Sequence, residues 1–90
     1  MYTPNQIIDE IRKLEALERL ADECDSAWEQ NPESEEAEAA FDDAYRSQWL
    51  QNEHCAQMIH EFSKNAIDMI TARRMLNREY RGRILEVIGA

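Results

Sequence analysis

Apolar side chains in the first thirty residues recur at alternating intervals of four and three, the spacing of one face of an α-helix. These positions are Ile7, Ile11, Leu14, Leu17, Ala21, Cys24 and Trp28. Thr3 is placed to be the N-cap, Pro4 to take the first helical position, and Gln6 to complete a capping box. The pattern therefore predicts a helix over about residues 4–30.

A second helix is predicted to start at Asn31-Pro32, with Asn31 as the N-cap and Pro32 at the first helical position. No Gly or Pro occurs again before Gly82, so the helical segment is expected to cover about residues 32–88. A straight helix from residue 33 to 81 would be about 70 Å long, which is too long for a compact monomer. The segment is therefore expected either to fold back or to pair with a second copy.

Two places in this long segment are candidate breaks: residues 51–54, and residues 63–65, where Asn65 could cap a third helix that starts at Ala66. An apolar seam with some polar members argues for a continuous helix, because its alternation of four and three does not slip. Its members are Phe41, Tyr45, Gln48, Asn52, Cys55, Ile59, Phe62, Ala66, Met69, Arg73, Leu76 and Tyr80. The pattern leaves both a broken and a continuous helix open.

The composition favours an all-α protein. One Val, two Thr, two Gly and two Pro in 90 residues leave few strand formers and few turn residues. We expect a single helical domain over residues 1–90, folded as an antiparallel helical hairpin or a three-helix bundle with one long helical segment. Because so short a chain buries a small core, we expect it to assemble as a homodimer.

The sequence predicts neither a membrane segment nor a signal peptide. The longest apolar run, Ala39–Phe41, has three residues, whereas a membrane span needs about 20. The N-terminus lacks a basic stretch followed by an apolar one. Cys24 and Cys55 lie outside any CxxC spacing. We expect reduced thiols in a cytoplasmic protein, and a disulfide joining two helices is the alternative.

No pattern of catalytic or ligand-binding residues stands out. His60-Glu61 lacks the second His of a zinc-protease helix, and no Glu-x-x-His sequence of a di-iron bundle is present. His54, Met58 and Glu61 share one helix face but form only a loose set of ligands. Two Gly cannot build a phosphate-binding loop or a nucleophile elbow. We expect no enzymatic activity, no cofactor and no metal site.

Charge is the most informative feature of the sequence. The net charge is −9, with fourteen acidic and four basic residues in positions 1–50 but five and six in positions 51–90. No basic residue occurs from Leu20 to Tyr45, where Ala37, Ala40, Phe41, Ala44 and Tyr45 are expected to face inward. Ten acids in this stretch form a predicted binding surface together with Trp49: Asp22, Glu23, Asp25, Glu29, Glu33, Glu35, Glu36, Glu38, Asp42 and Asp43.

The C-terminal part is basic by contrast, through Arg73, Arg74, Arg78, Arg81 and Arg83. These arginines could pair with the acidic helices of the same or a partner chain. They could instead stabilise a helix C-terminus, or contact nucleic-acid phosphates. The last interpretation is less favoured, because an acidic protein is repelled from DNA at long range.

These features favour a non-enzymatic protein-binding module whose acidic surface docks into a basic groove of another protein. Small acidic helical proteins of phages and mobile elements include inhibitors of nucleic-acid-handling proteins that present carboxylates in place of phosphates. That analogy of class suggests a nucleic-acid mimic as a hypothesis. The alternatives are a structural or adaptor dimer whose acids serve solubility alone, and nucleic-acid binding through the arginines.

Overall fold

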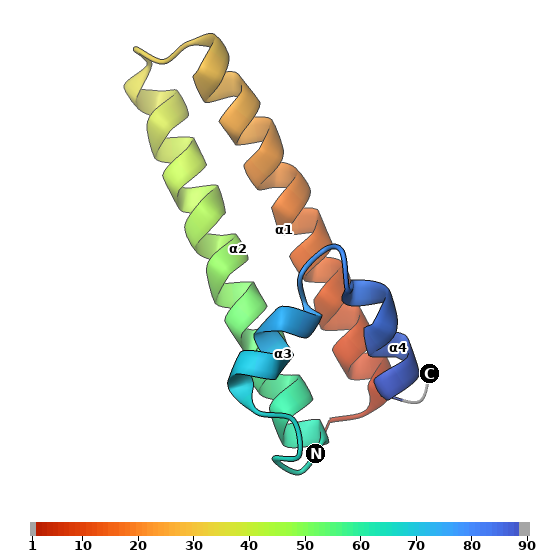
Figure 1. Cartoon of the computed structure of the whole chain (residues 1–90). Helices are drawn as coiled ribbons and strands as arrows, with labels where there is room; N and C mark the ends of the chain where they lie inside the picture. The colour runs from red at the N-terminus through yellow and green to blue at the C-terminus, as the bar shows by residue number, and fades with distance from the viewer. Residues whose placement is uncertain (1, 89–90) are drawn as a thin grey trace.

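The computed structural model describes residues 2–88, apart from the side chain of Leu85. Two long helices, α1 (Pro4–Gln30) and α2 (Glu35–Phe62), lie side by side in opposite directions (Figure 1). The chain then folds back over one end of this hairpin as α3 (Met69–Met75), a short 3-10 turn η1 (Arg81–Arg83) and α4 (Ile84–Val87). The predicted all-α class is therefore confirmed for residues 2–88.

Helix α1 matches its prediction at both ends. The Thr3 side chain accepts a hydrogen bond from the Gln6 backbone N–H at 3.2 Å, and the Gln6 side chain accepts one from the Thr3 N–H at 2.8 Å. This capping box satisfies two backbone donors that the first turn of a helix leaves without partners. Ile7, Ile11 and Leu14 of the predicted apolar face are buried.

The predicted start of the second helix is wrong by three residues. Asn31 closes α1 instead of opening α2, because its N–H donates to the Trp28 carbonyl at 3.1 Å. The N-cap of α2 is Ser34, whose hydroxyl accepts a hydrogen bond from the Ala37 N–H at 3.2 Å. Glu33 consequently lies in the turn, outside the first turn of the helix.

The long helical segment is broken at the second of the two predicted places, residues 63–65. Helix α2 runs without interruption through residues 51–54 and ends at Phe62, so the first candidate break and the continuous helix are both wrong. Lys64 and Asn65 adopt positive φ angles of 56° and 66° and reverse the chain. Asn65 therefore does not cap the third helix. Asp68 caps it, and its carboxylate accepts a hydrogen bond from the Thr71 N–H at 2.7 Å.

The core lies where the C-terminal segment covers the hairpin. α1 and α2 supply one side of it, and α3 with its C-cap Leu76, α4 and Ile88 supply the other. Its buried members are Ile7, Ile11, Leu14, Cys55, Ala56, Met58, Ile59, Ala72, Leu76, Ile84 and Ile88. The reversal after Phe62 breaks the predicted seam, because Ala72 and Leu76 must turn back to pack against α2. Gly82 lies within η1, and Gly89, the predicted C-terminal stop, lies outside the described residues.

The molecule is elongated, since the third layer covers part of the hairpin alone. Its extents are 47 × 19 × 18 Å and its radius of gyration is 15.0 Å, against about 12 Å for a spherical domain of this length. We call residues 20–50 the arm, which has two helical layers, and the remaining described residues the body (Figure 1). None of the helices within residues 2–88 has an apolar stretch long enough to cross a bilayer.

Replacing Ser34 by Ala should lower the free energy of unfolding by about 1 kcal/mol, because the N-cap hydrogen bond to Ala37 is lost. The control is Asn31→Ala, which should change it by much less, since the Asn31 backbone closes α1 whatever its side chain. Urea unfolding followed by circular dichroism measures both. A larger loss for Asn31→Ala would mean that α2 starts where the sequence pattern placed it.

Candidate functional site

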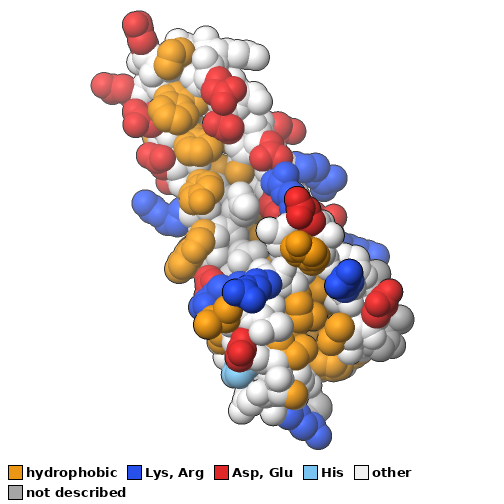
Figure 2. Space-filling model, viewed as in Figure 1, with side chains coloured by type: hydrophobic (Ala, Val, Ile, Leu, Met, Phe, Trp, Pro, Cys, Tyr) orange, Lys and Arg blue, Asp and Glu red, His pale blue; other side chains and the backbone are white. Residues whose placement is uncertain are grey.

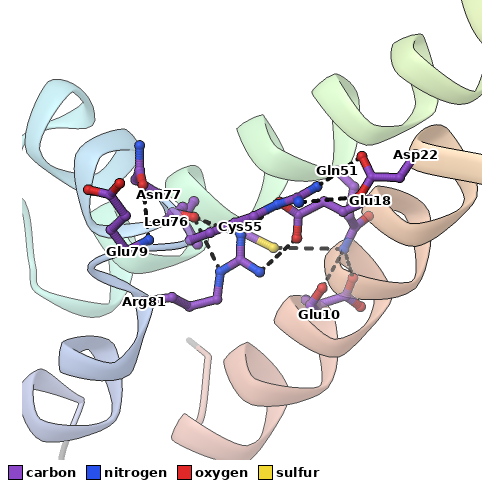
Figure 3. A network of polar contacts seen from close by, with 10 residues as sticks. Glu10, Glu18, Asp22, Gln51, Cys55, Leu76, Asn77, Glu79 and Arg81 are labelled. Atoms are coloured by element: carbon purple, nitrogen blue, oxygen red, sulfur yellow. Dashed lines mark hydrogen bonds and ion pairs between the residues drawn. The ribbon is translucent and has the colours of Figure 1, made fainter. Parts of the chain in front are cut away.

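A cluster of ion pairs joins the C-terminal segment to α1. Arg81 donates to both carboxylate oxygens of Glu18, with its Nη1 and Nη2 atoms at 2.7 and 3.0 Å (Figure 3). Arg78 contacts the same carboxylate through Nε at 3.1 Å and reaches Asp22 at 3.2 Å. Two arginines that are far from α1 in the sequence thereby attach the C-terminal segment to the middle of that helix.

Arg81 also fixes the local path of the backbone. Its guanidinium donates to the Leu76 carbonyl, with Nη2 at 2.7 Å and Nε at 3.2 Å. The side chains of Glu18 and Arg81 are 10 % and 14 % exposed. A charge-assisted bidentate pair with so little exposure is worth more than a pair on the open surface.

The ionisation of Glu18 depends on these arginines. Burial by itself raises the pKa of a carboxyl group, but the hydrogen bonds from Arg81 and Arg78 outweigh it, so the pKa of Glu18 is below its ordinary value. Glu18 is therefore a structural anion at neutral pH. It cannot act as a general acid there.

The two cysteines are free, so the disulfide alternative is not realised. Burial, reinforced by the negative charge of Glu10, raises the pKa of Cys55 to about 12. Gln51 lies between them and donates to the Glu10 carboxylate at 2.7 Å and to the Glu10 carbonyl at 2.9 Å. A thiol with so high a pKa is protonated at neutral pH and is a poor nucleophile.

Of the five arginines predicted as a basic surface, three form ion pairs within the chain and two lie exposed. Arg73 makes a bidentate pair with Glu53 at 2.7 and 3.0 Å, and Arg78 and Arg81 hold Glu18. Pairing within the chain, one of the three interpretations, therefore accounts for three arginines. Arg74 and Arg83 are exposed and, together with Tyr80, line a separate hollow beside α3.

The predicted acidic surface lies along both helices of the arm and in the turn between them. Asp25 is half-buried, and the other nine acids are exposed. Asp22 pairs with Arg78, in line with the interpretation that the arginines pair with the acidic helices of the same chain. Within residues 2–88, no basic side chain lies within ion-pair distance of the other nine. These nine carboxylates are therefore screened by solvent and salt alone.

Four aromatic side chains form a row along the arm, and we call them the aromatic row. The Trp28 and Phe41 rings stack with centroids 5.4 Å apart, and Phe41 stacks on Tyr45 at 6.0 Å. Trp49 continues the row on α2, and both it and Tyr45 are 57 % exposed. Figure 2 shows hydrophobic side chains running down the arm with acidic side chains on either side.

The aromatic row corrects the prediction that Tyr45 and Ala40 face inward, since both are exposed. Ala44 is buried as expected, and Ala37 and Phe41 are half-buried. The difference arises because the arm has no third layer to cover the rest of the apolar face. Trp28 has a related mismatch, as its indole N–H is buried but has no hydrogen-bond acceptor among the described residues.

A hollow of about 520 Å³ lies at the foot of the aromatic row, where the third layer begins. Tyr45, Gln48, Trp49 and Asn52 line it from α2. The facing wall comes from α1 and from the segment around the end of α3: Glu18, Arg73, Leu76, Asn77, Arg78 and Glu79. The exposed row thus continues directly into the face that the C-terminal segment covers.

Within residues 2–88, no group of three or more His, Cys, Asp or Glu residues is arranged to hold a metal ion. The His54 ring faces Glu10 at 3.9 Å, and the His60 Nδ1 atom lies 2.6 Å from the Ile67 carbonyl. Comparison with protein families, curated proteins and solved structures finds no match to this chain. The arm is therefore the candidate site that the geometry itself supplies.

Replacing Glu18 by Gln should lower the free energy of unfolding by about 2–3 kcal/mol at pH 7, because Arg81 and Arg78 lose the charge that compensates them. The exposed neighbour Glu15→Gln is the control and should change it by under about 0.5 kcal/mol. Because the pKa of Glu18 is lowered in the folded state, its contribution is present above about pH 4.3 and disappears as the pH falls further. Denaturant titrations should therefore show a smaller difference in the free energy of unfolding between the wild type and Glu18→Gln at pH 3 than at pH 7. Equal differences at both pH values would contradict this role.

Proposed function

We propose that this chain is a non-enzymatic protein-binding module that docks through its arm onto a basic groove of another protein. One observation carries the proposal. Nine carboxylates without a basic partner lie on the part of the molecule that projects beyond the body. Three of them, Asp25, Glu38 and Asp42, adjoin the aromatic row, in which Tyr45 and Trp49 are exposed. Exposed tryptophan and tyrosine side chains are typical of binding hot spots, and surrounding charges steer association.

The contrast between the two parts of the molecule supports an interaction surface over simple solvation. The body holds nine acidic and nine basic residues, and Glu10, Glu18 and Glu53 each have a basic partner there. The arm holds ten acidic residues and one basic residue. In the arm, most carboxylates have none, so their mutual repulsion destabilises the fold. A basic groove would offset that repulsion, and it would bury aromatic surface at the same time.

A narrower form of the proposal makes the arm a nucleic-acid mimic, as in inhibitors of phage or mobile-element type. Its carboxylates are spread along an elongated molecule with extents of 47 × 19 × 18 Å, so they could occupy a row of phosphate sites. The partner would then be a nucleic-acid-handling protein. Duplex DNA should compete with the chain for such a partner. A partner that DNA does not displace would rule out mimicry but leave docking through the arm intact.

The alternatives are weakened to different degrees. Direct nucleic-acid binding through the arginines is disfavoured, because Arg73, Arg78 and Arg81 already pair with carboxylates of the chain. A structural or adaptor homodimer would need the second copy to cover the aromatic row. If the arms of two copies packed side by side, their unpaired carboxylates would repel one another, which opposes that assembly.

Replacing Glu35, Glu38 and Asp42 by Lys should abolish salt-sensitive capture of a partner and slow association at least about tenfold. All three side chains are exposed, so the fold should persist. Relief of repulsion and the loss of Glu35 and Glu38 from the first turn of α2 act in opposite directions, so the melting temperature should stay within about 3 °C of the wild-type value. The measurement is affinity capture followed by association kinetics at two salt concentrations.

The matched control reverses three exposed acids of the body, Asp9, Glu61 and Glu86, to Lys. It changes the net charge by the same amount but leaves the arm intact. Equal loss of binding in both variants would reduce the effect to net charge. Retained binding in the folded arm variant would mean that the acids serve solvation, and the proposed function would be abandoned.

The wild-type chain should not retard a 30-base-pair DNA duplex in a gel at about 150 mM salt. The arm repels phosphates, and among the predicted basic residues Arg74 and Arg83 alone have no ion pair in the described part of the chain. An Arg74→Ala/Arg83→Ala double variant serves as the control. A salt-sensitive shift that this variant removes would transfer the binding site from the arm to the C-terminal segment.

A further inference from the structure

We propose that the aromatic row receives an amphipathic basic helix of the partner protein, laid along the hairpin as a third helix. This inference rests on the proposed function and deepens it, because it specifies the shape and chemistry of the partner segment. It depends on three features of the described residues. They are the uncovered half of one helical face, the way in which the chain covers the other half, and the placement of charges along the row.

The first feature is the incomplete third layer. α3 and the turn after it cover the α1–α2 face up to the level of Glu18, where Arg78 and Arg81 pair with its carboxylate. Arg78 also reaches the exposed side chain of Asp22 at the edge of the open face. Beyond that level the same face is open, with the hollow at its foot and the aromatic row above. An exposed apolar strip between two helices is the geometry into which an amphipathic helix binds.

The second feature is that the chain itself shows what this face accepts. The C-terminal segment places Ala72 and Leu76 in the apolar centre. It then places a guanidinium on each edge, with Arg73 on Glu53 of α2 and Arg78 on Glu18 and Asp22 of α1. A partner helix with a central apolar stripe and basic flanks would continue this arrangement along the arm.

The third feature is the charge beside the row. Glu38 and Asp42 lie three residues before Phe41 and Tyr45, so they are their neighbours on the surface of α2. Asp25 has the same relation to Trp28 on α1. Charge complementarity therefore places Arg or Lys on the partner helix beside Trp28, Phe41 and Tyr45.

Arg46, three residues before Trp49, is the single base within residues 20–50. A neutral or acidic partner residue fits beside it, at the end of the row next to the body. The expected charge pattern is therefore asymmetric, which gives the bound helix a preferred direction.

The open face has a definite length. From residue 19 to the end of α1 at Gln30 it spans twelve residues, which is about 18 Å of helix. A partner segment of about 12–15 residues, or three to four turns, would cover it. Such a segment carries three or four apolar side chains at i, i+3 or i+4, and i+7 spacing, which matches the four rings of the row.

The experiment uses a displayed library of random 16-residue peptides, selected on the immobilised full chain at about 150 mM salt. Selected peptides should share apolar residues at helical spacing with Arg or Lys beside them. They should become helical on binding by circular dichroism. Selection of no peptide, or of peptides without helical periodicity, would overturn the inference.

Selected peptides are then titrated against arm variants. Tyr45→Ala/Trp49→Ala should weaken binding at least tenfold. Leu50→Ala should leave it within twofold, because Leu50 is equally exposed, at 56 %, but points about 100° away from Trp49 on the same helix. Equal losses from both variants, or no loss from the first, would contradict docking on the aromatic row.

Two further measurements separate this inference from the proposed function. Glu38→Lys/Asp42→Lys should weaken peptide binding and reduce its salt dependence. If Glu38→Lys/Asp42→Lys weakens peptide binding and Tyr45→Ala/Trp49→Ala does not, the arm still binds by charge. In that case the helix docking is wrong but the proposed function stands. If neither acts, both proposals fail. Sedimentation of a dimer that Tyr45→Ala/Trp49→Ala dissociates would show that a second copy covers the row, which also overturns the inference.

Discussion

The bidentate pair between Glu18 and Arg81 determines where this molecule changes from three layers to two. Helices of seven and four residues are too short to persist by themselves in water, so α3 and α4 depend on their contacts with the hairpin. Arg81 supplies part of that contact by joining Glu18 to the Leu76 carbonyl. The position of Glu18 on α1 therefore fixes how far the C-terminal segment reaches, and with it how much of the hairpin stays uncovered.

The elements that the sequence predicts correctly are those determined by nearby residues. The capping box of Thr3 and Gln6 and the apolar positions from Ile7 to Leu14 involve separations of three or four residues, which a pattern can reveal. Nearby residues do not determine the turn after α1, because Asn31 and Ser34 are both good N-caps and Pro32 fits either position. Closure of α1 by the Asn31 N–H decides between them, and that bond appears in the folded backbone alone.

The candidate site divides in the same way. The acids of the arm could be predicted as exposed, since they fall on the polar side of amphipathic helices. The pairing of Arg78 with Glu18 could not, because the two residues are separated by 60 positions and meet only after the chain reverses at Lys64 and Asn65. The exposure of Tyr45 has the same origin. Its place in an apolar seam predicts burial, and the missing third layer prevents it.

The distribution of indole rings has a spectroscopic consequence. The chain has two tryptophans, and Trp28 and Trp49 both lie in the arm. Intrinsic tryptophan emission therefore reports on the arm alone, whereas far-ultraviolet circular dichroism averages over every helix. Trp28 lies half-buried against Phe41 and Trp49 faces solvent, so their emission maxima should differ. Agreement between the two optical probes during unfolding would mean that the two-layered and three-layered parts melt as one cooperative unit.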